Sequence, residues 1–251
     1  MNSFNKEQIY IVTGASSGIG EGTALLLNEL GATVIGIARN EERLNAMKAK
    51  CKYPENMHLE IKDLTEDIEG LPQYVKELKN KYGKFSGMAY CAGISALCPA
   101  KIIEYTFATN VLNINYLAPL FMTKGIIDKR NNVGKGCSLV FMSSIDALIS
   151  TKGQCLYAGS KAALQASMKT ISKEVASQGV RINTLSPSMI KTPMTDLTDL
   201  NIVDSTGNLY PWGWGEVSDV ANMIAYLLSD QAKFISGQNY IIDSGFVGGQ
   251  L

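Results

Sequence analysis

Histidine is nearly absent from this sequence, with His58 the one example in 251 residues. The five cysteines are odd in number, and none has C-x-x-C spacing or lies beside a pair of histidines. Too few soft ligands remain for a zinc site, so no metal is expected. We expect the cysteines to be free thiols in a reducing compartment.

Net charge and long apolar runs are also missing. The 23 basic and 23 acidic residues are spread along the chain without a basic block, which argues against nucleic acid as a partner. No stretch of 18 apolar residues occurs, and the first eight residues are polar with no signal-type apolar region. We therefore expect a cytoplasmic protein without a membrane partner.

Apolar runs of strand length alternate with helix-period segments along the whole chain. This alternation is typical of a parallel sheet with helices on both faces. The predicted strands span residues 9–12, 33–38, 57–61, 87–90, 138–142, 181–185 and 239–242. The predicted helices span residues 20–30, 42–50, 71–81, 102–129, 158–177 and 217–228.

No linker or repeat divides the chain, so the sequence predicts one Rossmann-type, doubly wound α/β domain over residues 1–251, with about seven strands. Residues 191–215 lack a periodic pattern. We interpret this segment as a substrate loop or lid, because long loops in compact domains are often functional.

A glycine-rich turn, TGASSGIG at positions 13–20, follows the first predicted strand and opens a predicted helix. Its glycines allow a tight turn, let the backbone approach a pyrophosphate and place that anion at the positive end of the helix. The candidate contacts to a dinucleotide are Gly14, Ser16, Ser17, Gly18, Ile19 and Gly20.

The end of the second predicted strand indicates which dinucleotide is preferred. Ala38 occupies the place where NAD-preferring folds carry an acidic residue for the ribose 2′-hydroxyl, and Arg39 follows. A guanidinium is suited to binding a 2′-phosphate. We therefore predict NADP(H) as the preferred cofactor and keep NAD(H) as the alternative.

Tyr157 and Lys161 are four residues apart, so a helix would bring them to one face. An unperturbed tyrosine has a pKa of ~10. An ammonium ~4 Å away at an effective dielectric of ~20 would stabilise a phenolate by up to ~4 kcal/mol, or ~3 pKa units. The pair is therefore a candidate for acid/base chemistry near neutral pH.

Together, the G-x-x-x-G-x-G turn and the Y-x-x-x-K pair resemble the short-chain dehydrogenase/reductase family, in its branch of about 250 residues, over essentially the whole chain. The resemblance implies that Ser144, thirteen residues before Tyr157, bonds to the substrate oxygen, with Ser143 as the alternative. It also implies that Asn115 aligns with Lys161 through a water, with Asn110 and Asn113 as competitors.

The resemblance implies further cofactor contacts as well. These are Asp63 and Leu64 near the adenine, Cys91, Ala92 and Gly93 after the fourth strand, and Pro187, Ile190 and Thr192 near the nicotinamide. Two positions depart from the family pattern: Cys91 replaces an asparagine and Ser188 replaces a glycine.

The implied activity is an NADP(H)-dependent oxidoreductase that interconverts a secondary alcohol and a ketone, a carbonyl reductase or 3-oxoacyl-reductase-like enzyme with Tyr157 transferring the proton. The expected substrate is a small or medium neutral carbonyl compound. A non-catalytic NADP(H)-binding regulator and a sugar-nucleotide epimerase or dehydratase on a related fold are the alternatives, but the second class has a longer carboxyl-terminal substrate domain. Assembly as a homotetramer is expected, with a dimer second.

Overall fold

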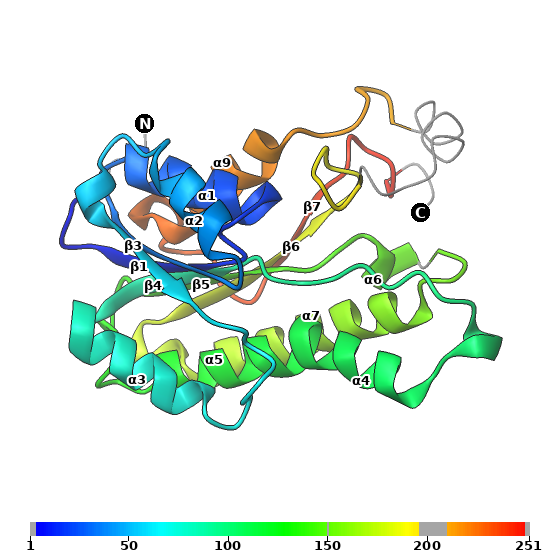
Figure 1. Ribbon diagram of the computed structural model, residues 1–251, viewed down its shortest axis with the longest axis horizontal. Helices are drawn as coiled ribbons and strands as arrows, with labels where there is room; N and C mark the ends of the chain where they lie inside the picture. The colour runs from blue at the N-terminus through cyan, green and yellow to red at the C-terminus, as the bar shows by residue number, and fades with distance from the viewer. Residues whose placement is uncertain (1–3, 150, 196–209, 249–251) are drawn as a thin grey trace.

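The computed structural model describes residues 4–149, 151–195 and 210–248. A seven-stranded sheet with the order β3-β2-β1-β4-β5-β6-β7 forms the centre of the molecule (Figure 1). Every neighbouring pair of strands is parallel. The strands are β1 (Ile9–Thr13), β2 (Thr33–Ala38), β3 (Met57–Ile61), β4 (Phe85–Tyr90), β5 (Ser138–Met142), β6 (Arg181–Pro187) and β7 (Asn239–Ile242). The predicted single α/β domain with a Rossmann-type sheet is confirmed.

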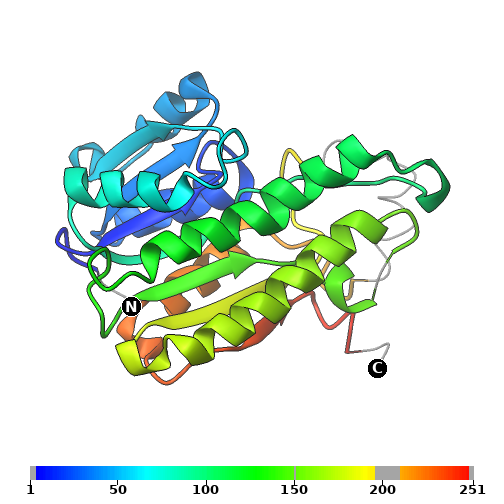
Figure 2. The ribbon, with the colours of Figure 1, turned by 90° about the horizontal axis from the view of Figure 1, so that it is seen from below.

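Helices cover both faces of the sheet (Figures 1 and 2). One face carries α1 (Gly18–Glu29), α2 (Glu41–Lys48) and α9 (Val217–Leu228). The other carries α3 (Leu71–Tyr82), α4 (Tyr105–Leu112), α5 (Ala118–Ile126) and α7 (Cys155–Glu174), while α6 (Asp146–Ile149) follows β5. Short 3₁₀ turns lie at Pro54–Asn56, Ala100–Ile102, Ala176–Gln178 and Asp230–Ala232.

Two buried cores lie on the two faces of the sheet, and the central strands contribute side chains to both. Each core combines side chains of the sheet with those of the helices on that side. β4, β5 and β6 bury every residue. Burial on both faces explains why parallel strands are continuous apolar runs without alternation.

The prediction of one helix over residues 102–129 was wrong. Residues Ile103 and Glu104 are extended, α4 begins at Tyr105, and a π-helical turn at Asn113–Leu117 separates α4 from α5. In this turn the N–H of Ala118 donates to the carbonyl of Asn113, five residues back. Pro119 lacks an N–H and its ring would clash with the carbonyl four residues earlier in a regular α-helix, which accounts for the wider turn.

The order of the strands determines where a ligand can bind. β1 lies between β2 and β4, so the connections from β1 and from β4 run in opposite directions along the sheet. Such a switch point opens a crevice at the carboxyl ends of the strands. The glycine-rich turn after β1 and the segment after β4 therefore meet at this crevice.

Candidate active site

The turn after β1 has the geometry of an anion cradle. Gly14 and Gly18 have positive φ angles of 68° and 55°, which a side chain would strain. A Cβ on Gly20 would lie 2.2 Å from the carbonyl oxygen of Gly14. Ser17 is the N-cap of α1 and makes no side-chain hydrogen bond to the helix, so its side chain leaves the first N–H groups of α1 available as anion donors. These features fit a dinucleotide pyrophosphate.

Gly20→Ala is expected to lower the free energy of unfolding by about 1–3 kcal/mol and to weaken the binding of a dinucleotide at least tenfold, because the turn must open to admit the methyl group. Gly159→Ala is the matched control, since a Cβ on this helical glycine meets nothing within 4 Å. The control should stabilise the protein by about 0.5–1 kcal/mol. Thermal unfolding and fluorescence titration test both; equal stability of the two variants would contradict the close approach.

The segment after β4 is bound to the end of β1. The Thr13 hydroxyl oxygen accepts hydrogen bonds from the backbone N–H groups of Cys91 and Ala92, both at 3.1 Å. Burial raises the pKa of the Cys91 thiol to about 12, although a hydrogen bond with Thr23 lowers it. Cys91 is therefore a neutral packing residue. A Cβ on Gly93 would lie 3.3 Å from Lys161 Nζ, so this glycine borders the lysine directly.

At the outer end of the crevice, Arg39 follows β2 and Asp63 follows β3. Arg39 Nη1 lies 3.4 Å from Asp63 Oδ2, and the arginine side chain is 73% exposed. Burial alone would raise the pKa of Asp63, but hydrogen bonds from Thr65 and Arg39 lower it. Leu64 beside it is buried. Arg39 and Asp63, two candidate cofactor contacts that follow different strands, thus form an ion pair. The sequence did not indicate this pairing.

Lys161 lies deep in the same crevice, on the first turns of α7. Its Nζ donates to the Met142 carbonyl oxygen at 2.8 Å and lies 5.6 Å from the centroid of the Tyr157 ring. Burial lowers the pKa of Lys161 to about 8. Because α7 begins at Cys155, two residues before Tyr157, the helix holds Tyr157 and Lys161 on one face as predicted.

The two serines after β5 point in different directions. Ser144 lies close enough to Tyr157 for its hydroxyl to lower the pKa of the phenol. Ser143 instead donates to the Lys161 carbonyl oxygen at 3.2 Å and accepts from Gln165 Nε2 at 2.7 Å. Ser143 is therefore engaged between the sheet and α7, and Ser144 is the serine beside the phenol.

The protonation of Tyr157 differs from the sequence argument. Burial raises its pKa to about 12, the nearby Ser144 hydroxyl lowers it, and the charge of Asp146 raises it further. The expected net lowering by Lys161 was wrong, because burial dominates and the ammonium lies beside the ring. Tyr157 is thus a neutral phenol near pH 7, which suits it to donate a proton.

Asn115 occupies the π-helical turn and is fully buried. Its Oδ1 accepts from the Ile94 N–H and its Nδ2 donates to the Ile94 carbonyl, both at 3.0 Å. Nδ2 also lies 3.2 Å from Ser160 Oγ. Of its competitors, Asn110 is exposed and Asn113 is half-buried. Asn115 therefore ties the segment after β4 to α7 beside Lys161.

The segment after β6 closes the crevice from the other side. A Cβ on Gly18 would lie 3.3 Å from Thr192 Cγ2, so Thr192 borders the glycine-rich turn. Ile190 is buried and forms a bridge with Gly215. Pro187 ends β6 and is buried. Of the predicted lid at 191–215, residues 196–209 lie outside the described residues.

Two polar residues near Ser144 were not identified from the sequence. Asp146 accepts a hydrogen bond from Ser144 Oγ at 3.4 Å. Tyr210 is buried, and its phenol lies close to the Ser188 side chain and the Met189 backbone. A lone carboxylate in the apolar run IDALI after a buried strand was the signal for Asp146. Tyr210 had none, because only the tertiary fold brings it to Ser188.

The described residues contain neither a helix with the length and apolar character of a membrane span nor a group of three or more His, Cys, Asp or Glu that could hold a metal ion. All five cysteines are free thiols.

A glycine cradle at a Rossmann switch point, with tyrosine, lysine and serine at its inner end, defines a dinucleotide-dependent oxidoreductase. Comparison with known proteins agrees with this class of protein. The family described as enoyl-(acyl carrier protein) reductase matches residues 14–247. The chain belongs to the short-chain dehydrogenase/reductase family and is an oxidoreductase similar to 3-oxoacyl-(acyl-carrier-protein) reductases.

The relatives match along nearly their whole length. The 3-oxoacyl-(acyl-carrier-protein) reductase FabG of Rickettsia conorii is 32% identical, covering 94% of this chain and 95% of that protein. The protein of the same name from Thermotoga maritima is 29% identical over 96% of this chain and 98% of its own. A dehydrogenase/reductase structure from Sinorhizobium meliloti 1021 has a TM-score of 0.88 at 26% identity, covering 97% of this chain and 96% of its own.

Proposed function

We propose that this protein is an NADP(H)-dependent carbonyl reductase that interconverts a ketone and a secondary alcohol. The observation that carries the proposal is the position of Ser144 beside the phenol of Tyr157, with the Nζ of the buried Lys161 5.6 Å from the centroid of the tyrosine ring. Two hydroxyl groups at one point can hold a carbonyl oxygen, and the glycine cradle lies at the other end of the same crevice.

Each residue would have one role. When bound, the nicotinamide supplies a hydride to the carbonyl carbon, or accepts one from the alcohol. Ser144 would hydrogen-bond the carbonyl oxygen, and Tyr157 would donate its phenolic proton to that oxygen as negative charge develops there. Lys161 would orient the nicotinamide ribose and stabilise the phenolate by its charge. Asn115 would hold the segment after β4 in place beside Lys161.

The cofactor would be held by the cradle and by both flanks of the crevice. We assign Gly14, Ser16, Ser17, Gly18, Ile19 and Gly20 to the pyrophosphate, Asp63 and Leu64 to the adenine, Cys91, Ala92 and Gly93 to the crevice floor, and Pro187, Ile190 and Thr192 to the nicotinamide. The contact between Thr192 and Gly18 supports this set, because it joins the two flanks around one elongated ligand.

Preference for NADP(H) rests on Arg39. Its exposed guanidinium directly follows β2, whose last residue, Ala38, carries no charge. A 2′-phosphate would therefore gain a charge-assisted hydrogen bond from Arg39 and would meet no repelling carboxylate at position 38. The ion pair between Arg39 and Asp63 would have to loosen to admit the phosphate, which limits the gain in binding free energy.

Arg39→Ala is expected to raise the Kd for NADPH about tenfold and to leave the Kd for NADH unchanged, because only NADPH has the 2′-phosphate. Arg43→Ala, an exposed arginine on α2, serves as the control. Fluorescence titration with both cofactors measures the change. Tighter binding of NADH than of NADPH by the unaltered protein would refute the preference.

The activity is tested by absorbance at the nicotinamide band with NADPH and a panel of ketones, comparing the wild type with Tyr157→Phe. Turnover that depends on Tyr157 supports the proposal. Tight NADPH binding without turnover would instead identify a non-catalytic NADP(H)-binding regulator.

Three further proposals concern the protein as a whole. Residues 191–215 would act as the substrate lid, supported by the bridge between Ile190 and Gly215 that joins its two ends. A homotetramer, with a dimer second, is supported by large apolar side chains exposed near α4 and β7, namely Ile102, Tyr105, Leu112, Phe234 and Ile241. The free cysteines fit a cytoplasmic location.

A further inference from the structure

The end of β5 holds Lys161 at two of its atoms. The Met142 carbonyl oxygen accepts from Lys161 Nζ at 2.8 Å, and the Ser143 hydroxyl donates to the Lys161 carbonyl oxygen at 3.2 Å. Both hydrogen bonds are buried. Ser144, which lies beside the Tyr157 phenol, is the next residue of the same segment. The position of this segment against α7 therefore sets how the ammonium, the Ser144 hydroxyl and the phenol lie relative to one another.

Gln165, one helical turn after Lys161, sets the direction of this contact. Its Nε2 donates to Ser143 Oγ at 2.7 Å and to Ser186 Oγ at 2.9 Å. Ser186 in turn donates to Asn239 Oδ1 at 2.9 Å. A hydroxyl has one proton to donate, and both serines accept from Gln165, so the Ser143 proton is directed to the Lys161 carbonyl. The side chain of Gln165 thus joins α7 to the end of β5 and to β6.

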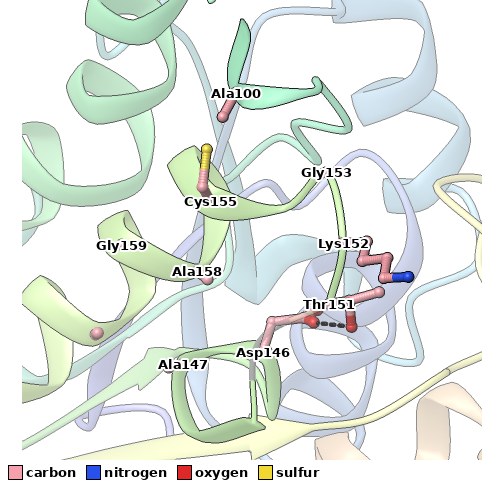
Figure 3. Close-up of a pocket in the computed structure, with 10 residues that line it drawn as sticks. Ala100, Asp146, Ala147, Thr151, Lys152, Gly153, Cys155, Ala158 and Gly159 are labelled. Carbon is pink, nitrogen blue, oxygen red and sulfur yellow. Dashed lines mark hydrogen bonds between the residues drawn. The ribbon is translucent and has the colours of Figure 1, made fainter.

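Packing leaves this part of α7 with gaps beside it. A cavity of about 500 Å³ lies along the helix, lined by small helical residues that include Cys155, Gly159 and Ala162 (Figure 3). Ala162 also lines a second cavity of about 300 Å³, together with Gln165 and residues of β6 and β7. A void offers no partner atoms, so the helix lacks dispersion contacts at both places. The hydrogen bonds of Gln165 therefore carry more of the restraint on the position of α7 here.

We propose that Gln165 is a positioning residue for the reaction. Through Ser143, it keeps the Lys161 carbonyl against the end of β5. This contact fixes the Lys161 ammonium and the Ser144 hydroxyl relative to Tyr157. The inference rests on the proposed reductase activity and adds a residue to the same site. Gln165 affects the rate through Lys161 and Ser144, and not by contact with the reacting atoms.

Gln165→Leu keeps a side chain of similar size and removes both hydrogen bonds to the serines. With NADPH and a ketone that the wild type reduces, kcat should fall about ten- to a hundredfold, because a displacement of ~1 Å at a reacting group costs up to ~10²-fold in rate. KM for the ketone should change less than threefold, since Ser144 and Tyr157 remain. Rates are expressed per dinucleotide-binding site, so that a misfolded fraction does not count.

Gln165→Glu separates the direction of the hydrogen bonds from the volume of the side chain. An ionised carboxylate has the same shape and only accepts, so the Ser143 proton would turn from the Lys161 carbonyl to residue 165. The loss in kcat should match that of Gln165→Leu. Gln73→Leu, at an exposed glutamine of α3, is the control and should change neither kcat nor KM. A purely structural role would lower the melting temperature of the Gln165 variants and leave kcat per binding site at the wild-type value, which would overturn the inference.

A double-mutant cycle tests the route through Ser143. Ser143→Ala removes the hydrogen bond to the Lys161 carbonyl, and kcat should fall to a similar extent as in Gln165→Leu. In the Ser143→Ala background, Gln165→Leu should lower kcat less than twofold further, because changes within one hydrogen-bond network are not additive. Full additivity of the two losses would contradict the inference while leaving the reductase activity intact.

Failure of the proposed activity has a different signature, because the wild type then reduces no ketone. In that case calorimetry compares the Kd of the dinucleotide that binds more tightly with the Kd of its adenosine half, 2′,5′-ADP for NADPH or ADP for NADH. Since Lys161 would contact the nicotinamide ribose, Gln165→Leu should weaken binding of the dinucleotide at least fivefold and of the adenosine half less than twofold. Equal effects on both compounds, or none on either, overturn the inference, and a wild type that binds no dinucleotide contradicts both proposals.

Discussion

Tyr157→Phe is expected to lower kcat for ketone reduction by about a thousandfold, because positioned proton transfer contributes ~10²–10⁴ to such rates. The change removes one oxygen, the one that lies beside Ser144. The ring and its contact with Lys161 remain. NADPH affinity should therefore change less than threefold. Stopped-flow measurement of a single turnover at saturating NADPH separates the chemical step from binding.

Tyr105→Phe is the matched control, since that tyrosine is 84% exposed on α4 and should not affect the rate. A Tyr157→Phe variant that retained more than a tenth of the wild-type kcat would show that another group protonates the substrate. The pH dependence should agree with a neutral phenol. Because the pKa of Tyr157 is raised to about 12, reduction should persist at mildly alkaline pH, while oxidation of the alcohol, which needs the phenolate, should accelerate as pH rises.

Lys161→Met should abolish activity yet increase the free energy of unfolding at pH 7 by about 1–3 kcal/mol. Lys161 is 4% exposed, and burial lowers its pKa from 10.5 to about 8. The folded protein therefore bears the cost of a buried ammonium at neutral pH. Methionine has a similar length without the charge. The loss of the hydrogen bond from Lys161 to the Met142 carbonyl reduces this gain in stability.

The gain should depend on pH in a defined direction. Below about pH 8 both folded and unfolded Lys161 are protonated, and the cost of burial is constant. Between about 8 and 10.5 the folded state has released the proton and the unfolded state has not, so wild-type stability rises with pH relative to the variant. Denaturant unfolding at pH 7 and pH 10 measures the difference. Lys169→Met, an exposed lysine of the same helix, should show neither effect, and an Lys161→Met variant less stable than the wild type would contradict the argument.

Local sequence patterns were sufficient to predict most strands and helices, because these elements depend mainly on residues close together in the chain. β2, β3, β5, β7 and α9 have their predicted bounds, since each is a single apolar run or an amphipathic period between turn residues. The prediction of one helix over residues 102–129 was wrong. A proline inside a helix-period segment can either break the helix or widen one of its turns, and packing decides between the two. The observed π turn brings Asn115 to the crevice.

The sequence by itself determined the class of fold, the glycine cradle after β1 and the pairing of Tyr157 with Lys161, because each depends on residues close together in the chain. Only the tertiary structure decided which serine faces Tyr157, that Arg39 meets Asp63, and that Tyr210 and Asp146 share one electrostatic environment. It also reversed the direction of the Tyr157 pKa shift. Burial and contacts between distant segments set these properties, and neither is encoded in residue spacing.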